Sequence, residues 1–244
     1  MISEKQLAEY FHSFWDDHFP LLNSSFIRRF NLEKKQRLHT ESGKMVSAIE
    51  MGRGSDRFDL IAELAFELAM TSYQDDTGAN RGPSSAIVRA MARIATLKGL
   101  STIPEASVGE LEEAHALLQN YLVFFKTVAT TGDLRFRPLI KGVGFLSQME
   151  ADFCSSRVLF EVKAVNRNLQ STDLRQVICY LVAGLRSKDY SWTKYCIFNP
   201  RLATYYVGEV EGLLEYLSGR SSSECIHDVS SALMEREQPI EMKF

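Results

Sequence analysis

Apolar side chains recur every three or four positions over much of the first half of the chain, which is the spacing of amphipathic helices. The segments with this pattern are 3–22, 57–73, 86–99 and 105–128. Between the second and third of them, residues 74–85 concentrate Gly, Pro, Asn, Asp and Ser, which predicts a loop. The pattern therefore indicates a helical N-terminal part that leads into the long helix 105–128.

Beyond residue 129 the pattern shortens to that of strands. Residues 134–140 alternate between apolar and polar, and two apolar runs, 148–153 and 157–165, flank Cys154-Ser155-Ser156, which predicts a hairpin. The remaining predicted elements are a helix over 171–186 capped by Ser171 or Thr172, strands over 192–198 and 203–210, and helices over 211–219 and 223–235. The sequence thus predicts a helical region over 1–103 and an α/β core over 104–244.

Two charged residues interrupt the second arm of the predicted hairpin. Side chains alternate between the faces of a strand, so Glu161 and Lys163 share one face, while the opposite face is uniformly apolar. Burying such charges without partners costs several kcal/mol or more. We therefore interpret Glu161 and Lys163 as part of a site.

A third charged residue, Asp152, lies on the first arm and can reach the same place. Two carboxylates on adjacent strands suit Mg²⁺, which takes few protein ligands and keeps waters, and the main-chain carbonyl of Val162 is a plausible third ligand. Such an ion can activate water and neutralise a phosphodiester, and Lys163 can orient the water or offset the phosphate charge. This grouping predicts metal-dependent phosphodiester cleavage.

The arrangement Asp152…Glu161-Val-Lys163 resembles the PD-(D/E)xK nuclease superfamily, which includes restriction endonucleases, lambda exonuclease and the RecB nuclease domain. Gln176 and Tyr180 on the next helix form a Q-x-x-x-Y pattern similar to that of RecB-type and lambda-exonuclease-type members. The resemblance implies a restriction-endonuclease-like core, a mixed sheet flanked by helices, that hydrolyses DNA with Mg²⁺ or Mn²⁺. It assigns metal binding to Asp152 and Glu161, water activation to Lys163, and the lining of the site to Gln176 and Tyr180.

The family pattern leaves one ligand open, because many members add a helix glutamate to the metal site. Glu110, Glu112 and Glu113 compete for this role, and Glu113, one turn before Leu117, is favoured. Acidic residues at a helix start also complement the helix dipole without any further role. Glu150 shares a strand face with Asp152 and is an alternative ligand or a solvated carboxylate, and Ala151 stands where the family name has Pro.

Composition and charge indicate where this activity would take place and with which partners. The net charge of −3 gives no global sign of a nucleic-acid binder, so any phosphate-binding groove is local. The four Cys are far apart and form no CxxC pair, no signal peptide is evident, and no apolar run is long enough to span a bilayer. We therefore expect a cytoplasmic protein with DNA and no membrane as its partner.

Partners and alternatives follow from what the sequence lacks. No nucleotide-hydrolysis motif is present, so any ATP-driven translocation along DNA requires a helicase or ATPase partner. Region 1–103 would either dock this partner or gate the access of DNA to the site. A nuclease component of a defence or DNA-repair system is the predicted context. A ribonuclease, a non-catalytic binding module and a homo-oligomer stay open. Secondary candidates for phosphate contact, each equally explained as surface residues, are the basic segment 24–38 and Arg167, Asn168, Arg175 and Arg201.

Overall fold

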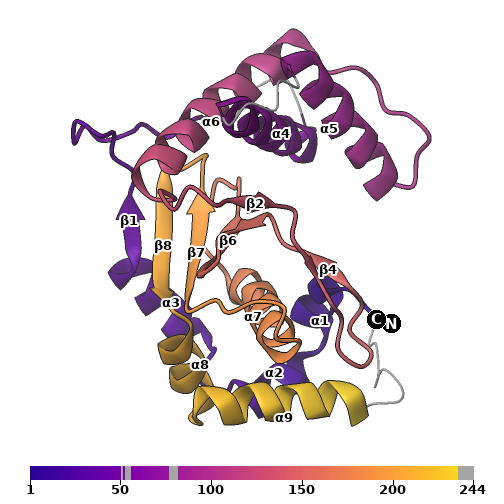
Figure 1. Ribbon diagram of the computed structural model, residues 1–244, viewed down its shortest axis with the longest axis vertical. Helices are drawn as coiled ribbons and strands as arrows, with labels where there is room; N and C mark the ends of the chain where they lie inside the picture. The colour runs from indigo at the N-terminus through magenta and orange to yellow at the C-terminus, as the bar shows by residue number, and fades with distance from the viewer. Residues whose placement is uncertain (51, 53–55, 77–81, 236–244) are drawn as a thin grey trace.

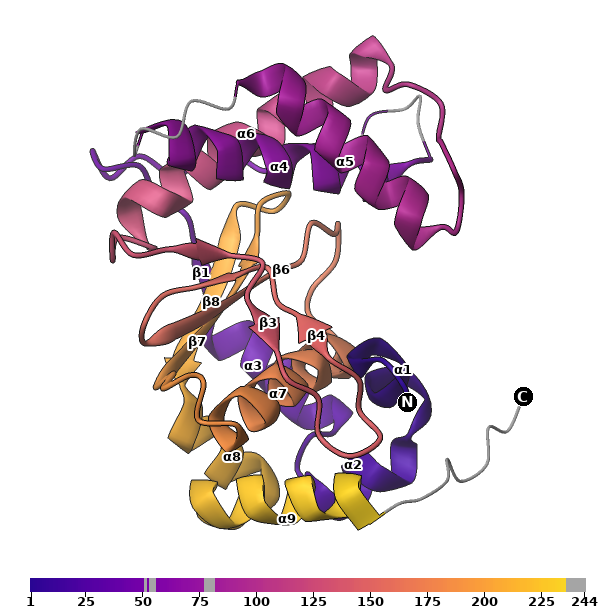
Figure 2. The ribbon, with the colours of Figure 1, turned by 45° about the vertical axis from the view of Figure 1, so that its right-hand side comes forward.

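The computed structural model describes residues 1–50, 52, 56–76 and 82–235, and it shows a mixed α/β fold with helices on both faces of a central sheet (Figures 1 and 2). Part of the loop predicted over 74–85, namely 77–81, lies outside the described residues. The helices are α1 (Glu4–Tyr10), α2 (His12–His18), α3 (Ser24–Glu33), α4 (Phe58–Asp76), α5 (Pro83–Leu97), α6 (Val108–Thr127), α7 (Ser171–Arg186), α8 (Val210–Ser218) and α9 (Ser222–Glu235). The strands are β1 (Lys35–Arg37), β2 (Arg135–Phe136), β3 (Leu139–Ile140), β4 (Met149–Glu150), β5 (Phe153–Cys154), β6 (Val158–Val162), β7 (Lys194–Asn199) and β8 (Thr204–Glu209).

The central sheet has six strands among the described residues, in the order β1-β8-β7-β6-β5-β2. Strands β6 and β7 are parallel and are connected through α7, whereas the other neighbours in this sheet are antiparallel. A parallel pair needs a long crossover, and a helix of this length supplies it. Strands β3 and β4 form a separate two-stranded sheet beside it.

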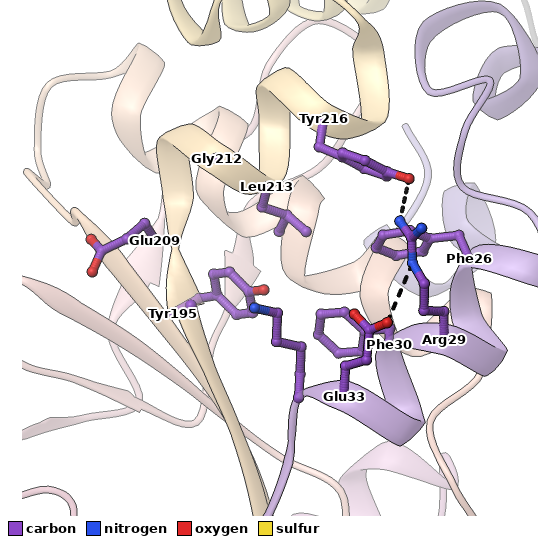
Figure 3. Close-up of a pocket in the computed structure, with 11 residues that line it drawn as sticks. Phe26, Arg29, Phe30, Glu33, Tyr195, Glu209, Gly212, Leu213 and Tyr216 are labelled. Atoms are coloured by element: carbon purple, nitrogen blue, oxygen red, sulfur yellow. Dashed lines mark hydrogen bonds and ion pairs between the residues drawn. The ribbon is translucent and has the colours of Figure 1, made fainter.

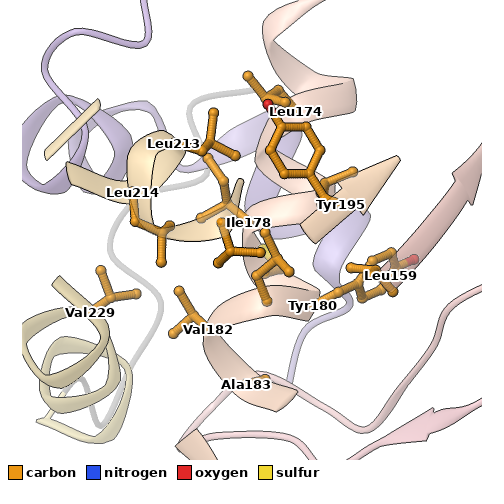
Figure 4. Close-up of a cluster of buried hydrophobic side chains, with 14 of the residues drawn as sticks. Leu159, Leu174, Ile178, Tyr180, Val182, Ala183, Tyr195, Leu213, Leu214 and Val229 are labelled. Carbon is orange, nitrogen blue, oxygen red and sulfur yellow. The ribbon is translucent and has the colours of Figure 1, made fainter. Parts of the chain in front are cut away.

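Each face of the sheet carries its own hydrophobic cluster. Helices α4, α5 and α6 cover one face, where Phe124 of α6 stacks on Phe198 of β7 with ring centroids 4.0 Å apart. The other face packs against α7, with α8 and α9 beyond it, as Figure 4 shows for Ile178 and Val182 of α7. Burial of each large apolar side chain is worth about 1.5–3 kcal/mol, so both faces contribute to stability. A strand such as β6 is therefore interior on both sides.

The N-terminal residues do not form a core of their own. Helices α1 to α3 pack with α7, α8 and α9, and Phe14 and Trp15 are almost fully buried in that cluster. Strand β1 pairs with β8 and so extends the central sheet, with Lys35 opposite Tyr206. Helices α4 and α5 form the opposite layer with α6, and Leu38, Val46 and Ile49 of the preceding segment pack into the same cluster. The division expected at residue 103 thus does not separate two packing clusters.

Most predicted elements are confirmed, and the differences have local causes. The helix predicted over 3–22 is broken at Phe11, whose φ of −101° and ψ of 60° are not helical. The strand predicted over 134–140 is interrupted at Arg137, which adopts a φ of 52° just before Pro138. Helix α7 is capped by Gln170 in a capping box with Asp173, so the caps predicted at Ser171 and Thr172 are wrong. None of the described helices is both long and apolar enough to cross a membrane.

Candidate active site

The hairpin of β5 and β6 sets Asp152 beside Glu161. Phe153 lies opposite Phe160 in the ladder, and continuing this register by one residue places Asp152 opposite Glu161. The Asp152 carboxylate also accepts a hydrogen bond of 2.6 Å from the backbone N–H of Val162. Both acids are therefore held at the end of β6 from which the chain continues to Lys163.

Helix α7 brings Gln176 and Tyr180 to the same place, where they meet Lys163 at the end of β6. Lys163 Nζ donates to Glu161 Oε1 at 2.9 Å and to Gln176 Oε1 at 2.5 Å. Gln176 Nε2 in turn donates to the Tyr180 hydroxyl at 2.7 Å, as the spacing of four residues on one helix allows. The structure thus links Glu161, Lys163, Gln176 and Tyr180 in one hydrogen-bonded chain, with Asp152 next to it.

Burial dominates the electrostatics of the two acids. Glu161 is 4% exposed, and its Oε2 atom has no hydrogen-bond partner among the described residues. Burial and then the Asp152 charge raise the pKa of Glu161 to about 8, although Lys163 opposes the shift. Burial also raises the pKa of Asp152, against the opposing hydrogen bond from Val162. The site therefore holds two close carboxyl groups that resist carrying two negative charges at once.

The two other titratable groups keep their protons. Burial alone would lower the pKa of Lys163, but the charge and hydrogen bond of Glu161, together with the charges of Asp173 and Asp152, outweigh burial and raise it. Burial raises the pKa of the Tyr180 hydroxyl, and the charge of Glu161 adds to this effect. Lys163 is thus a fixed cation and Tyr180 a neutral hydroxyl near neutral pH.

A further carboxylate near this group, Glu4, had no sequence signal. Its Oε1 lies 3.3 Å from both Gln176 Nε2 and the Tyr180 hydroxyl. Helix α1 starts at Glu4 because Ser3 and Gln6 form a capping box, which a sequence pattern can indicate. The packing of α1 on α7, which brings Glu4 to Gln176, is a tertiary contact that no local pattern encodes.

The helix glutamates considered as further metal ligands lie elsewhere. Glu113 pairs with the buried Arg201 at 2.6 Å and accepts from the Gly52 N–H at 2.8 Å, so it is not brought to Asp152 and Glu161. Glu110 pairs with Arg57, and Glu112 is exposed on α6.

The alternative ligand Glu150 is engaged in ion pairs. It lies 2.6 Å from Arg93 Nη2 and 3.3 Å from Arg137 Nη1. In the described part of the chain, no group of three or more His, Cys, Asp or Glu side chains is placed to hold a metal ion. Among the described residues, no third carboxylate is therefore placed with Asp152 and Glu161 as a metal ligand.

Arg137 connects the hairpin to the layer of helices α4, α5 and α6, and no sequence pattern predicts this role. Its backbone N–H donates to the Asp152 carbonyl at 2.8 Å. Its guanidinium pairs with Glu63 and Glu67 of α4 and lies over the Phe66 ring at 5.0 Å. Helix α4 thereby holds Arg137 and, through it, the backbone at Asp152.

The four single residues named as secondary phosphate contacts each have a structural partner. Arg175 donates to the Ala8 carbonyl at 3.1 Å and is 7% exposed, while Arg201 is 1% exposed and bound to Glu113. Arg167 pairs with Asp173 at 2.5 Å. Asn168 accepts a hydrogen bond of 2.8 Å from Lys35 of β1. Of these, Arg175 and Arg201 are too enclosed to meet a phosphate in this arrangement.

Comparison of the chain with protein-family models, with curated proteins and with solved structures found no match. The class of site is therefore defined by its own geometry. It combines two adjacent acids, one with an unpartnered oxygen, with a fixed cation and an amide–hydroxyl pair. These groups can bind a cation, hold a proton and offset the charge of an anionic substrate.

Proposed function

We propose that this protein is a metal-dependent nuclease that hydrolyses DNA phosphodiester bonds on a restriction-endonuclease-like core. The observation that carries the proposal is the convergence of Asp152, Glu161 and Lys163 at one end of β6, with Gln176 and Tyr180 beside them. Buried charges are expensive, so an enclosed cluster of this kind is typical of functional sites. The order of α6, the hairpin strands, α7 and β7 is consistent with such a core.

The donor set fits a magnesium ion. Asp152 and Glu161 would hold it, with the main-chain carbonyl of Val162, the residue between Glu161 and Lys163 in the chain, as a further oxygen ligand. Glu161 Oε2 is the buried carboxylate atom that lacks a hydrogen-bond partner among the described residues. Mg²⁺ is bound through one or two carboxylates and keeps several waters, so a third acid such as Glu113 is not required. When bound, the ion supplies an activated water and neutralises phosphate charge.

The side chains themselves would position the substrate and handle charge. Lys163, held by Glu161 and Gln176, is a cation that would offset the negative charge developing on the phosphate. Gln176 would keep the Lys163 ammonium in place, and Tyr180 keeps the Gln176 amide in place. This chain of hydrogen bonds preorganises the cation before substrate arrives.

Substrate access depends on the N-terminal helices. Glu161 is 4% exposed and the Lys163 side chain 13%, while Glu4 of α1 lies against Gln176 and Tyr180. We infer that α1 gates DNA at this site, or that a helicase or ATPase partner moves it. A cytoplasmic nuclease component of a defence or DNA-repair system remains the proposed setting.

A second candidate function is a non-catalytic module that binds nucleic acid or protein. The enclosure of the site favours it, because Glu161 is 4% exposed and Glu4 of α1 lies against Gln176 and Tyr180. A panel of single-stranded and duplex DNA and RNA, each with Mg²⁺ or Mn²⁺, separates the candidates when the Asp152→Ala variant is the control. Cleavage of DNA that is lost in the variant supports the deoxyribonuclease. Cleavage of RNA alone would make it a ribonuclease, and metal-independent binding without cleavage would favour the module.

A further inference from the structure

A groove along α3 and α8 contains none of the residues of the candidate active site. It consists of a cavity of about 350 Å³ between α3, α8 and the end of β8, and a second hollow of about 740 Å³ along α3. The residues that line both are Phe26, Arg29, Glu33 and Tyr216, so the two hollows adjoin. Figure 3 shows the first cavity, with the aromatic rings of α3 and the Tyr216 ring around it.

Aromatic and apolar side chains make the walls of this groove. Tyr216 is 45% exposed, and its ring centroid lies 5.5 Å from that of Phe26. Arg29 holds the Tyr216 ring by a hydrogen bond to its hydroxyl and by a guanidinium 5.4 Å from the ring centroid. In the second hollow, Leu32 is 79% exposed and Leu21 is 43% exposed. The groove therefore exposes one aromatic ring and two apolar side chains to solvent.

Cations without partners accompany these surfaces. Arg28 lines the second hollow and Lys34 the first, and neither side chain has an ion pair within the described residues. The two acids of the groove are partly neutralised, because Glu33 lies 4.0 Å from Arg29 and Glu209 lies 3.3 Å from Lys194. Two positive charges thus remain for an anionic ligand.

A glycine keeps the first cavity open. Gly212 is the third residue of α8, and a Cβ there would meet no atom within 4 Å. A glycine inside a helix costs roughly 1 kcal/mol relative to alanine, and α8 has no steric need for it at this place. The missing side chain leaves space beside the exposed Tyr216 ring.

We propose that this groove binds single-stranded nucleic acid, with one base against Tyr216 and Phe26 and the flanking phosphates on Arg28 and Lys34. Stacking rings combined with unpaired cations are the chemistry by which proteins hold single strands. The adjoining second hollow extends past the space that one nucleotide needs, which favours a strand over a free nucleotide. A duplex hides its base faces and has nothing to offer these rings.

One lining residue of the groove is the neighbour in sequence of a residue that contacts the segment after Lys163. Lys34 lines the groove, and the next residue, Lys35, donates to Asn168 in the segment that follows Lys163. The binding itself does not depend on the proposed cleavage.

The test is fluorescence anisotropy of a labelled single-stranded DNA of about 20 nucleotides, in EDTA so that no metal-dependent cleavage occurs. Tyr216→Ala should weaken binding by between about 5-fold and 150-fold, the range for loss of one stacked base. Lys34→Ala should lower the slope of log affinity against log salt by about 0.7, because one phosphate contact is lost. Gly212→Met should fill the cavity and weaken binding at least about tenfold without destabilising α8, since Met is the better helix former.

Matched controls make the outcome decisive. Tyr10→Ala and Lys44→Ala remove an exposed ring and an exposed cation elsewhere, and Gly109→Met fills open space at an exposed helical glycine of α6. These controls should bind like the wild type. Equal binding by the groove variants, equal binding of duplex, or equal affinity for thymidine monophosphate would each overturn the proposal. If the wild type binds single-stranded DNA through the groove but does not cleave DNA with Mg²⁺, the proposed nuclease activity is contradicted and the groove proposal is supported.

Discussion

Replacing Glu161 with Gln tests the electrostatics on which the site rests. The substitution keeps the shape of the side chain and an oxygen that can accept from Lys163, but it removes the carboxyl group whose Oε2 has no partner. Because burial and Asp152 raise the pKa of Glu161 to about 8, the folded protein holds this proton more tightly than the unfolded chain does.

The sign and size of the effect follow from that shift. A carboxyl whose pKa is raised on folding lowers the free energy of unfolding as pH rises from its ordinary range to its folded value. A rise from about 4.5 to about 8 corresponds to ~5 kcal/mol at 1.36 kcal/mol per unit. The variant escapes this penalty and loses some attraction to Lys163. Its free energy of unfolding relative to wild type should therefore rise by a few kcal/mol between about pH 5 and pH 8.5.

Urea unfolding in EDTA, followed by circular dichroism at about pH 5, 6.5 and 8.5, measures this difference. Near pH 5 the two proteins should agree within about 1 kcal/mol, because the Glu161 carboxyl is then neutral. Glu112→Gln, on the exposed part of α6, controls for the loss of one acidic residue away from the site. A variant that loses stability relative to wild type as pH rises would refute the reasoning, because Lys163 would then hold Glu161 ionised.

Three further outcomes are expected from the same structure. Lys163→Met should reduce the rate of cleavage by about 10²-fold or more. It should also move the onset of Mg²⁺ binding to higher pH, because Lys163 lowers the pKa of Glu161 and its loss leaves that pKa higher still. A pH profile of Mg²⁺ binding, measured by titration calorimetry, that does not differ from wild type would contradict this. Arg201→Ala should lower the free energy of unfolding by ~3–5 kcal/mol because it strands Glu113, and a loss below about 1 kcal/mol in urea would show the pair to be dispensable. Arg137→Ala should cost a similar ~3–5 kcal/mol and also raise hydrogen exchange at the backbone of the hairpin; protection equal to wild type would separate the hairpin from helix α4.

Much of the fold is predictable because its elements carry strong local periodicity. Helices α6 and α7 and strands β7 and β8 lie within a few residues of the segments predicted for them. Hydrophobic spacing is a local property, so it survives without knowledge of the tertiary structure. The predicted turn at 154–156 is shifted slightly, since Cys154 still belongs to β5 and the Ser155 N–H bonds to the Val158 carbonyl.

The parts that sequence reasoning missed depend on contacts between distant segments. Strand β1 has three residues and exists through its pairing with β8, about 170 positions later, so no alternation reveals it. Glu4 reaches Gln176 through the packing of α1 on α7. Glu113 was favoured by its place on the helix face, but the buried Arg201 is its partner. Burial of a cation can be recognised only once the fold is known.

Part of the candidate site could be predicted from the sequence for a related reason. Asp152 and Glu161 lie on two arms of one hairpin, so their proximity follows from a single turn. Gln176 is only one connection further along the chain, and its bond to Lys163 spans 13 positions. The closure of the site by α1 and the support of Asp152 by Arg137 involve the rest of the molecule. Short separations in sequence therefore set the limit of what could be predicted.

If Asp152 and Glu161 support metal-dependent cleavage of DNA, an isosteric substitution of one of them should abolish the reaction. Single-turnover hydrolysis of end-labelled DNA should be measured for wild type, Asp152→Asn and Glu112→Gln with Mg²⁺ and with EDTA. Asn at position 152 retains an acceptor for the Val162 N–H, so the hairpin stays in place. We expect Mg²⁺-dependent cleavage by wild type and Glu112→Gln and a loss of about 10²-fold or more in Asp152→Asn. Equal rates in all three proteins, or no cleavage by wild type under any divalent ion, would contradict it.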